Sequence, residues 1–393
     1  MRTPCRPSGE LNAGKSAGKT MLWFFPFLLF SIIMFLGGRA LPQDPLRLIP
    51  LLFTVVLVNL LFFLMMRTGR TDRYRAVYFI LMAVCFVISF LSHFQEARGS
   101  MSVNEAEMIK GRTPFCHMVI PQTFITSALT QTIIFPGSML GPYSIASMLV
   151  LWLGASLALG RGFCAWGCFF GGLEDGFSRF RKKALIQKIG EKWTYLPYAV
   201  LMVVMLASTA ALSPFYCTWL CPFKAVTEYA PVTSFTIFFQ TVLFLSLFLG
   251  LVVVLPILTK KRTQCGLFCP MGAFQSFTNK INPFEVRIDQ SRCQDCGKCL
   301  QVCPTFSLDQ SHAAAGRTRF SCVKCGKCMD ECPQGAISYH VKGTIASTPA
   351  QANWARMLFI YPAFLFLAVF GGGMIQDGLY RLLLFFTSGS FIQ

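Results

Sequence analysis

The sequence predicts a mainly α-helical membrane protein: a polytopic transmembrane bundle of about seven spans, with a small cysteine-rich α+β domain inserted before the last helix. Two observations lead to this fold class. Hydrophobic residues make up 54% of the 393 residues and charged residues only 13%, whereas average globular domains are about a quarter charged. The 17 cysteines fall mostly into short repeated spacings, which indicates metal ligation rather than a disulfide scaffold.

Apolar stretches along the chain approach the roughly 20 residues that a helix needs to cross a bilayer. We expect spans near residues 21–38, 47–66, 76–95, 140–160, 194–214, 235–259 and 357–376. The polar residues 1–20 are expected to form a disordered tail. The first span is either a retained anchor, which six further spans favour, or a cleaved signal peptide, since Gly38-Arg39-Ala40 follows it.

Two apolar segments need a separate interpretation. Segment 118–139 is broken by Pro121 and Pro136, so we expect a re-entrant or interfacial helix on the outer side, because irregular backbone at membrane depth needs cover from protein or water. Gly371-Gly-Gly373 lies within the last span and follows no predicted strand. It is expected to allow close helix packing rather than to bind a nucleotide.

The distribution of basic residues predicts the orientation in the membrane. Lys and Arg gather after the second, fourth and sixth spans, whereas the alternate loops are nearly balanced in charge. Positive loops stay in the cytoplasm. We therefore expect a bacterial inner-membrane protein whose N-terminus and segment 260–355 are cytoplasmic and whose C-terminus is periplasmic. The net charge of +18 follows from these patches beside apolar runs, so membrane lipid is the expected partner and nucleic acid is not.

The strongest motif is a cysteine run, C-x2-C-x2-C-x3-C-P, that occurs twice. This spacing is typical of bacterial two-cluster ferredoxins, in which the fourth cysteine of each run ligates the other cluster. One [4Fe–4S] cluster is accordingly assigned to Cys293, Cys296, Cys299 and Cys332. The other is assigned to Cys303, Cys322, Cys325 and Cys328. A pair of zinc sites is the alternative, but the repeat and its trailing prolines argue against zinc.

The motifs divide the chain into five expected parts. These are a tail (1–20), a transmembrane domain (21–259), a membrane-edge linker (260–283), a cytoplasmic 2[4Fe–4S] ferredoxin-like domain (284–345) and a C-terminal transmembrane helix (346–393). Within the fourth part, Lys298, Lys324 and Lys327 flank the cysteines. They either offset the charge of the clusters or are solvated surface residues.

A second motif, C-x3-C, occurs three times, each time just past the end of a predicted span. On a helix, residues i and i+4 lie on one face, so each pair can present two thiols to one metal. The predicted topology brings two of the pairs to the cytoplasmic boundary. There they supply four thiolates for a further cluster: Cys164, Cys168, Cys265 and Cys269.

The remaining pair falls at the outer boundary, where the loop after the third span also lies. The candidate ligands on that side are Cys116, His117, Cys217 and Cys221. They are expected to form an outer metal site or, because the outer face of a bacterial membrane is oxidising, a disulfide. Buried unligated thiols are the alternative for all three pairs. Cys5 and Cys85 have no expected role.

Together these motifs resemble the membrane polyferredoxins, which include the NapH-type, NosR-type and CcoG-type 4Fe–4S membrane proteins. That group combines several spans, C-x3-C-P pairs at the membrane edge and a cytoplasmic double ferredoxin run, and the likeness covers residues 140–340. The NapH type is the most similar, since we expect neither a flavin-binding domain before the first span nor a long outer domain after the last. One departure is that Phe169, not proline, follows Cys168.

The resemblance implies electron transfer between the quinone pool, the cytoplasmic clusters and an outer-side acceptor such as a periplasmic reductase, with the chain as a candidate quinol dehydrogenase subunit. A quinone is a candidate cofactor, and His93 and Glu96, at the outer end of the third span, are candidate proton-handling residues. Two alternatives remain. One is an accessory reductase for the maturation of a metal cofactor or disulfide, as in CcoG-like proteins; the other is a redox-sensing regulator.

Overall fold

A computed structural model describes residues 17–37, 41–91, 116–131, 145–186, 189–227, 232, 234–344 and 349–391. The candidate proton-handling residues His93 and Glu96 lie outside these described residues. So do Cys5, residues 1–16 of the predicted tail, and Gly38-Arg39-Ala40.

A helix lies on each of the seven apolar stretches predicted as spans. Six helices of the described residues are long and apolar enough to cross a membrane, and Met21–Leu36 is apolar but shorter, so the number of crossings stays a prediction. The first helix begins at Ala17, inside the segment predicted as a disordered tail. These helices are α1 (Ala17–Leu36), α2 (Pro45–Thr68), α3 (Asp72–Leu91), α6 (Ile145–Leu159), α9 (Leu196–Ala211), the consecutive α11 (Phe235–Leu247), η5 (Phe248–Val254) and α12 (Leu255–Thr259), and α17 (Pro349–Ser388).

Shorter helical segments connect these long helices. The segment predicted to be re-entrant or interfacial forms α5 (Val119–Thr130), whose 12 residues rise only about 18 Å and cannot cross a bilayer of about 30 Å. The other short segments are η2 (Gly160–Gly162), α7 (Phe163–Trp166), α8 (Phe169–Arg179), η3 (Glu191–Tyr195), η4 (Tyr216–Leu220), α10 (Lys224–Thr227), η6 (Gln264–Phe268) and α13 (Pro270–Ile281).

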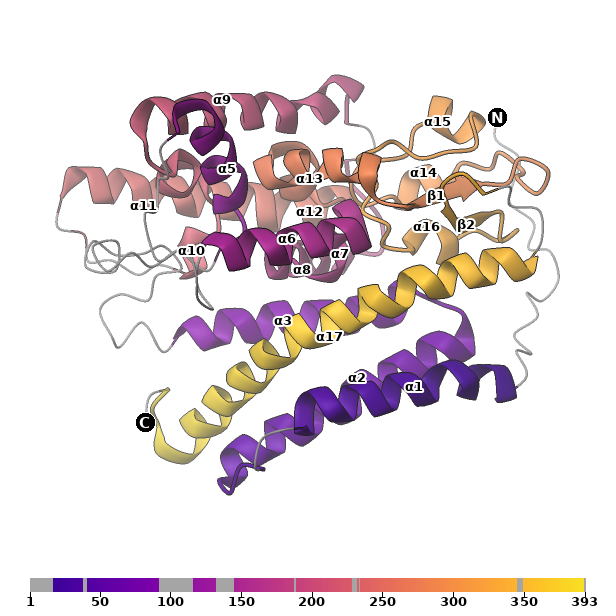
Figure 1. The fold of residues 1–393 in the computed structure, drawn as a ribbon. Coiled ribbons are helices and arrows are strands. Elements are labelled where there is room, and N and C mark those ends of the chain that lie inside the picture. Colours follow the sequence, from indigo (N-terminus) through magenta and orange to yellow (C-terminus); the bar gives the residue numbers. More distant parts are fainter. Residues whose placement is uncertain are drawn as a thin grey trace.

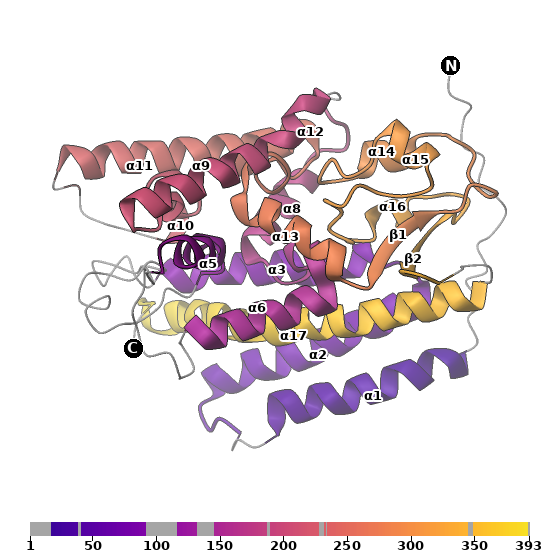
Figure 2. The ribbon, with the colours of Figure 1, turned by 45° about the horizontal axis from the view of Figure 1, so that its top comes forward.

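The helices form a bundle with a separate unit at one end. Helices α1, α2, α3 and α17 run side by side, and α5, α9, α11 and α13 lie on the other side of α3 (Figures 1 and 2). Residues 284–344, here called the cysteine-rich unit, lie at the end of the bundle opposite the one where α17 finishes.

The cysteine-rich unit contains the strands predicted for an α+β domain. Strand β1 (Phe284–Ile288) pairs antiparallel with β2 (Ile337–Val341), in a register that joins Phe284 to Val341 and Ile288 to Ile337. Between the strands lie α14 (Lys298–Val302), α15 (Gln310–Ala314) and α16 (Lys327–Asp330). The buried ring of Tyr339 stacks on Phe359 of α17 with 4.7 Å between ring centroids, so the sheet is packed directly against the last helix.

Helices α3 and α17 approach each other closely at glycines of α17, which confirms the packing role predicted for Gly371. A Cβ atom at Gly371 would lie 2.8 Å from the sulfur of Met82, and one at Gly378 would lie 2.5 Å from the carbonyl oxygen of Cys85. Cys85 is therefore a packing residue of this crossing. Gly373, by contrast, has no heavy atom within 4 Å of such a Cβ.

This crossing gives a stability prediction. We expect Gly378→Ala to destabilise the bundle by about 1–3 kcal/mol, because the added methyl group meets backbone of α3 that cannot rotate away. Gly373→Ala is the matched control, since it adds the same methyl group to open space on the same helix and should be neutral or stabilising. Thermal unfolding in detergent measures both. Equal unfolding temperatures for the two variants would contradict the close crossing.

Candidate metal centres

Two cavities of the cysteine-rich unit are each lined by four of the repeated cysteines. The larger, of about 300 Å³, is bordered by what we call the first set: Cys293, Cys296, Cys299 and Cys332. The narrower, of about 20 Å³, is bordered by the second set: Cys303, Cys322, Cys325 and Cys328. The fourth cysteine of each run thus lies with three cysteines of the other run. Cys296 is disulfide-bonded in this structure, whereas the other seven cysteines of the two sets have free thiols. Four cysteines around one cavity are the donors that a [4Fe–4S] cluster takes as thiolates, so the second set fits that group directly and the first set fits it once Cys296 is reduced.

The geometry also bears on the zinc alternative. Within the described residues, no three Cys, His, Asp or Glu side chains are close enough together to hold a single metal ion. A cluster spreads its ligands around several iron atoms and so takes thiols that are farther apart than those around one zinc.

Local backbone conformation brings the cysteines of each run together. Helices α14 and α16 are each preceded by a glycine in the left-handed conformation, with φ of 70° at Gly297 and 87° at Gly326. This conformation is readily adopted by glycine alone. Each turn places the third cysteine of its run, Cys299 or Cys328, in the first turn of the short helix that follows.

The second set faces the membrane helices, whereas the first set lies nearer the surface. Cys303 and Cys325 of the second set are 7% and 6% exposed, whereas Cys322 and Cys328 are half-buried, like the four cysteines of the first set. The two buried cysteines place the second set on the inner side of the unit, toward the bundle.

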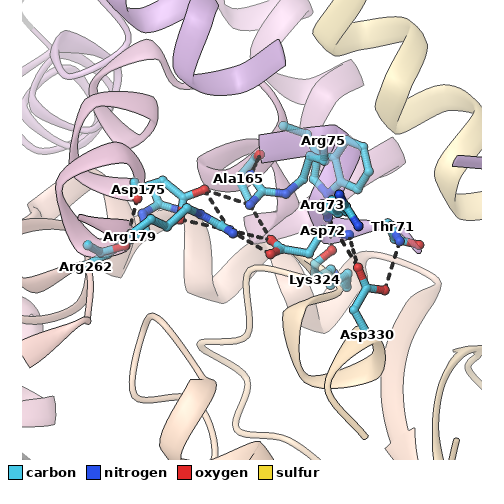
Figure 3. A network of polar contacts seen from close by, with 12 residues as sticks. Thr71, Asp72, Arg73, Arg75, Ala165, Asp175, Arg179, Arg262, Lys324 and Asp330 are labelled. Carbon is cyan, nitrogen blue, oxygen red and sulfur yellow. Dashed lines mark hydrogen bonds and ion pairs between the residues drawn. The ribbon is translucent and has the colours of Figure 1, made fainter. Parts of the chain in front are cut away.

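Asp330, the last residue of α16, attaches the unit to α3. Its carboxylate accepts hydrogen bonds from the backbone N–H groups of Thr71 (2.9 Å), Asp72 (2.7 Å) and Arg73 (3.3 Å), as Figure 3 shows. These are unpaired donors at the beginning of a helix, where a negative charge is favourable. Asp330 therefore acts as an N-terminal cap supplied from a distant part of the chain.

An ion-pair network continues from this contact to the first C-x3-C pair. Arg75 donates to Asp72 (2.6 Å), to Asp175 (2.8 Å) and to the carbonyl oxygen of Ala165 (2.7 Å), as drawn in Figure 3. Arg179 also pairs with Asp72, at 2.7 Å. Since Ala165 lies between the two cysteines of its pair, the position of that pair is tied to the helix that binds the cysteine-rich unit.

Lys324 forms a second attachment from within the second set. Its ammonium group donates to Asn279 (2.6 Å) and Asn282 (3.0 Å), and its carbonyl oxygen accepts from the indole of Trp166 (3.1 Å) and the hydroxyl of Tyr339 (2.9 Å). Lys324 is only 3% exposed, so the alternative of a solvated surface lysine is wrong there. Burial lowers the pKa of the Lys324 ammonium to about 7.

A third attachment reaches the fourth cysteine of the first run. The Lys261 ammonium donates to the carbonyl oxygens of Leu300 (3.0 Å) and Cys303 (2.7 Å), and the backbone N–H of Arg262 donates to Pro304 (2.7 Å). Lys261 and Arg262 directly precede the third C-x3-C pair. The second set is consequently held against both pairs that the sequence assigns to the cytoplasmic boundary.

Those two pairs, which we call the quartet, lie around two buried arginines. The quartet is Cys164, Cys168, Cys265 and Cys269, all buried. Arg262 donates to the carbonyl oxygen of Cys164 (2.7 Å) and the sulfur of Cys265 (3.1 Å), and Arg161 donates to the carbonyl oxygen of Cys265 (3.0 Å).

Both arginines keep unused donors. The Nε atoms of Arg161 and Arg262, together with Nη1 of Arg262, are buried without a hydrogen-bond partner. Buried polar atoms are usually paired, and two guanidinium groups beside four thiols suit an anionic group such as a thiolate-bound cluster. The residues of the quartet therefore fit the further cluster that their spacing predicts.

Burial controls the charge of these thiols. Burial raises the pKa of the Cys265 thiol well above its usual value. The nearby Arg262 partly opposes this increase, and Glu174 adds to it. Glu174 itself is fully buried, and this raises its pKa to about 7 although Arg262 opposes the shift. A thiol in such surroundings ionises when a metal binds it, because metal ligation displaces the proton. The site is thus suited to metal-bound thiolates rather than to a free reactive thiolate.

The structure corrects the predicted separation of an inner quartet from an outer group. Nε2 of His117 lies 3.4 Å from the sulfur of Cys168, and the Met118 and Cys269 sulfurs are 3.9 Å apart. These contacts join residues that were expected on opposite sides of the membrane. The reason is that α5 packs against α9 and α13, and η4 contacts η6 through Tyr216 and Gln264, rather than ending at a boundary. His117 accordingly lies beside the quartet.

The C-x3-C pairs also differ from the predicted two-thiol helix face. The first cysteine of each pair lies in a short helical turn, but Cys168, Cys221 and Cys269 have extended backbone with ψ of 105°, 107° and 116°. Each of these second cysteines ends its turn and precedes another helix. Within the described part of the chain, no disulfide joins Cys116, Cys217 and Cys221.

Sequence reasoning missed the residues that attach the cysteine-rich unit, namely Asp330, Arg75 and Trp166. Their only local signals are that Asp330 lies inside the second cysteine run and Trp166 inside the first C-x3-C pair. Arg75 belongs to the basic stretch after the second predicted span, yet it is 1% exposed. Its local signal is Asp72, an aspartate three residues before it in the sequence.

Comparisons with known proteins agree with this chemistry. A family described as "4Fe-4S dicluster domain" matches residues 285–333. A family described as "4Fe-4S binding domain" matches residues 140–186, 194–231 and 241–287, each of which contains one C-x3-C pair. The fold and its cysteine sets define an iron–sulfur protein of the membrane.

Individual relatives narrow the class of iron–sulfur protein to which the chain is similar. It is 32% identical over 180 residues to the uncharacterised protein MJ0750 of Methanocaldococcus jannaschii, covering 42% of this chain and 70% of that one. The ferredoxin-type protein MauN of Methylobacillus flagellatus (methylamine utilization) is 27% identical over 47% of this chain and 62% of its own length. The ferredoxin-type protein NapH of Haemophilus influenzae is 26% identical over 36% of this chain and 47% of its own length.

The chain therefore belongs to the membrane polyferredoxins of the NapH type, and iron–sulfur electron transport is its function class. The matches span 47% to 70% of the lengths of these curated relatives. No solved structure matches the chain significantly.

Proposed function

We propose that the chain relays electrons between the quinone pool, two [4Fe–4S] clusters in the cysteine-rich unit and an acceptor on the outer side of a bacterial inner membrane. The unit and the N-terminus lie in the cytoplasm and the C-terminus in the periplasm. When bound, the clusters supply one-electron transfer. The observation that carries the proposal is the direct attachment of the second set to the quartet through Lys324, Trp166 and Arg262.

Three sets of cysteines would hold the electron-carrying sites in a fixed sequence. The first set, the second set and the quartet lie in succession from the surface of the cysteine-rich unit into the bundle. A bilayer core is about 30 Å thick, which is far for one electron hop, so a site inside the bundle is needed for a relay. The buried Arg161 and Arg262 place positive charge beside the quartet, which favours an anionic cluster there.

The maturation alternative receives less support. It requires a thiol group on the outer side that can meet a metal ion or a disulfide of another protein. Cys116, Cys217 and Cys221 are buried beside the quartet, so a folded partner does not reach them directly. A relay needs no such access.

The test combines cluster content with reduction by quinol. We expect the anaerobically purified protein in liposomes to contain iron and acid-labile sulfide and to lose visible absorbance when a quinol is added. Cys332→Ser should disturb the cluster of the first set and Cys303→Ser that of the second, because the runs exchange their fourth cysteines. Cys85→Ser is the control. Zinc in place of iron, or clusters that no quinol reduces, would count against the relay.

A further inference from the structure

The second C-x3-C element in chain order, Cys217 to Cys221, has the same local build as the two elements of the quartet, which are the first and the third. In each, the first cysteine lies in a helical turn and the second has extended backbone, with φ and ψ of −80° and 107° at Cys221 against −72° and 116° at Cys269. A proline follows both second cysteines. A segment that repeats this conformation presents its thiols in the same way.

The two elements of the quartet face each other, whereas the second element faces the segment before α5. The fully buried Gln122 joins them. Its side-chain amide donates to the sulfur of Cys217 (3.5 Å) and to the carbonyl oxygen of Met118 (2.9 Å), and its oxygen accepts from the backbone N–H of Tyr216 (2.9 Å). Cys116, two residues before Met118, is thereby brought to the same place.

The three thiols form one buried group. Cys116, Cys217 and Cys221 are 8%, 8% and 5% exposed. An amide that donates to a cysteine sulfur is also the kind of contact that tunes thiolates bound to iron–sulfur clusters.

The group adjoins the quartet. Besides the contact of His117 with Cys168, the Gln264 side chain donates to the hydroxyl of the buried Tyr216 (2.9 Å), so the second and third elements are joined next to their first cysteines. In both overall views, α5 and α10 lie farther from the cysteine-rich unit than α7 and α13 (Figures 1 and 2). The group therefore lies beyond the quartet as seen from that unit.

We propose that Cys116, Cys217 and Cys221 hold a further iron–sulfur cluster inside the membrane bundle, next to the quartet, with one iron bound by a group other than cysteine. This inference rests on the proposed relay and extends it by one site toward the other side of the bilayer. An iron without a cysteine ligand is also where a small molecule can bind.

The experiment counts iron, acid-labile sulfide and zinc per chain in anaerobically purified full-length protein. We expect Cys217→Ser/Cys221→Ser to lose about three or four iron atoms and Cys116→Ser to show a changed electron paramagnetic resonance signal. Cys85→Ser, another buried cysteine, should retain all iron. Iron that remains in the first and second sets of each variant shows that the protein has folded.

The outcomes separate this inference from the proposed function. If the parent protein carries iron that depends on the first set, the second set and the quartet, but the double variant loses none, this inference is wrong and the relay stands. Zinc bound by the three thiols, or a disulfide between Cys217 and Cys221, would also overturn it. A parent protein without iron would instead refute the proposed function.

Discussion

Replacing Arg75 by methionine is expected to destabilise the protein by about 3–5 kcal/mol, because removing one partner of a buried ion pair leaves the other charge uncompensated. Asp72 and Asp175, which Arg75 joins, are 4% and 0% exposed, so water cannot replace the guanidinium. Arg179 still reaches both carboxylates, but it cannot bind the carbonyl oxygen of Ala165. We expect most of the protein to be lost from the membrane fraction.

The matched control for this variant is Arg47→Met. Arg47 also pairs with an aspartate three residues away, Asp44, but at 4.0 Å and with 61% of its side chain exposed. Exposed pairs contribute only about 0–1 kcal/mol, so this variant should accumulate normally. Adding Asp175→Asn to Arg75→Met removes one uncompensated charge and should recover part of the lost stability. Equal thermal stability of the Arg75 and Arg47 variants would show that the buried network does not support the fold.

The second large effect is expected at Asp330. Asp330→Ala removes the acceptor for three backbone N–H groups of α3, and a hydrogen bond to a charged group contributes about 1.5–3 kcal/mol. A loss of this size raises the fraction of detached cysteine-rich units by at least about tenfold. We expect slower reduction of iron in the bundle, with the iron content and the signals of the first and second sets unchanged.

Glu331→Ala is the control for this variant. Glu331 is the neighbouring acidic residue, but its pair with Lys298 is exposed, at 46% and 48% of the two side chains, so its loss should leave reduction unchanged. Hydrogen exchange at the amides of Thr71, Asp72 and Arg73 measures the attachment directly and should quicken only in Asp330→Ala. If exchange there stays slow, Asp330 does not hold the unit in place.

The cysteine sets of the unit were predictable because the information is local. A fixed spacing of two or three residues determines which thiols can surround one cluster, and the duplicated run specifies the exchange of Cys303 and Cys332. The attachment of the unit was not predictable in this way. Asp330 and Thr71 are 259 residues apart in the sequence, and Trp166 and Lys324 are 158 apart, and no periodic pattern connects such pairs.

The apolar stretches predicted the positions of the long helices well, because length and composition decide whether a helix can span a bilayer. The predicted separation of the outer group from the quartet was wrong for a related reason. A topology built by counting spans assigns every residue outside a span to one face of the membrane. Cys217 follows a predicted span, so this procedure places it at the outer face. The short helices α5 and α10 fold back beside the long ones, which a count of crossings does not register.

Helix α17 has 40 residues, a length of about 60 Å, and packs against α2 and α3 as well as against β2. It follows both cysteine runs in the chain, so a ribosome synthesises it after them. The early helices α2 and α3 therefore lack this neighbour until both cysteine runs have been translated. The bundle can thus close around α17 only after the cysteines of the unit have been synthesised.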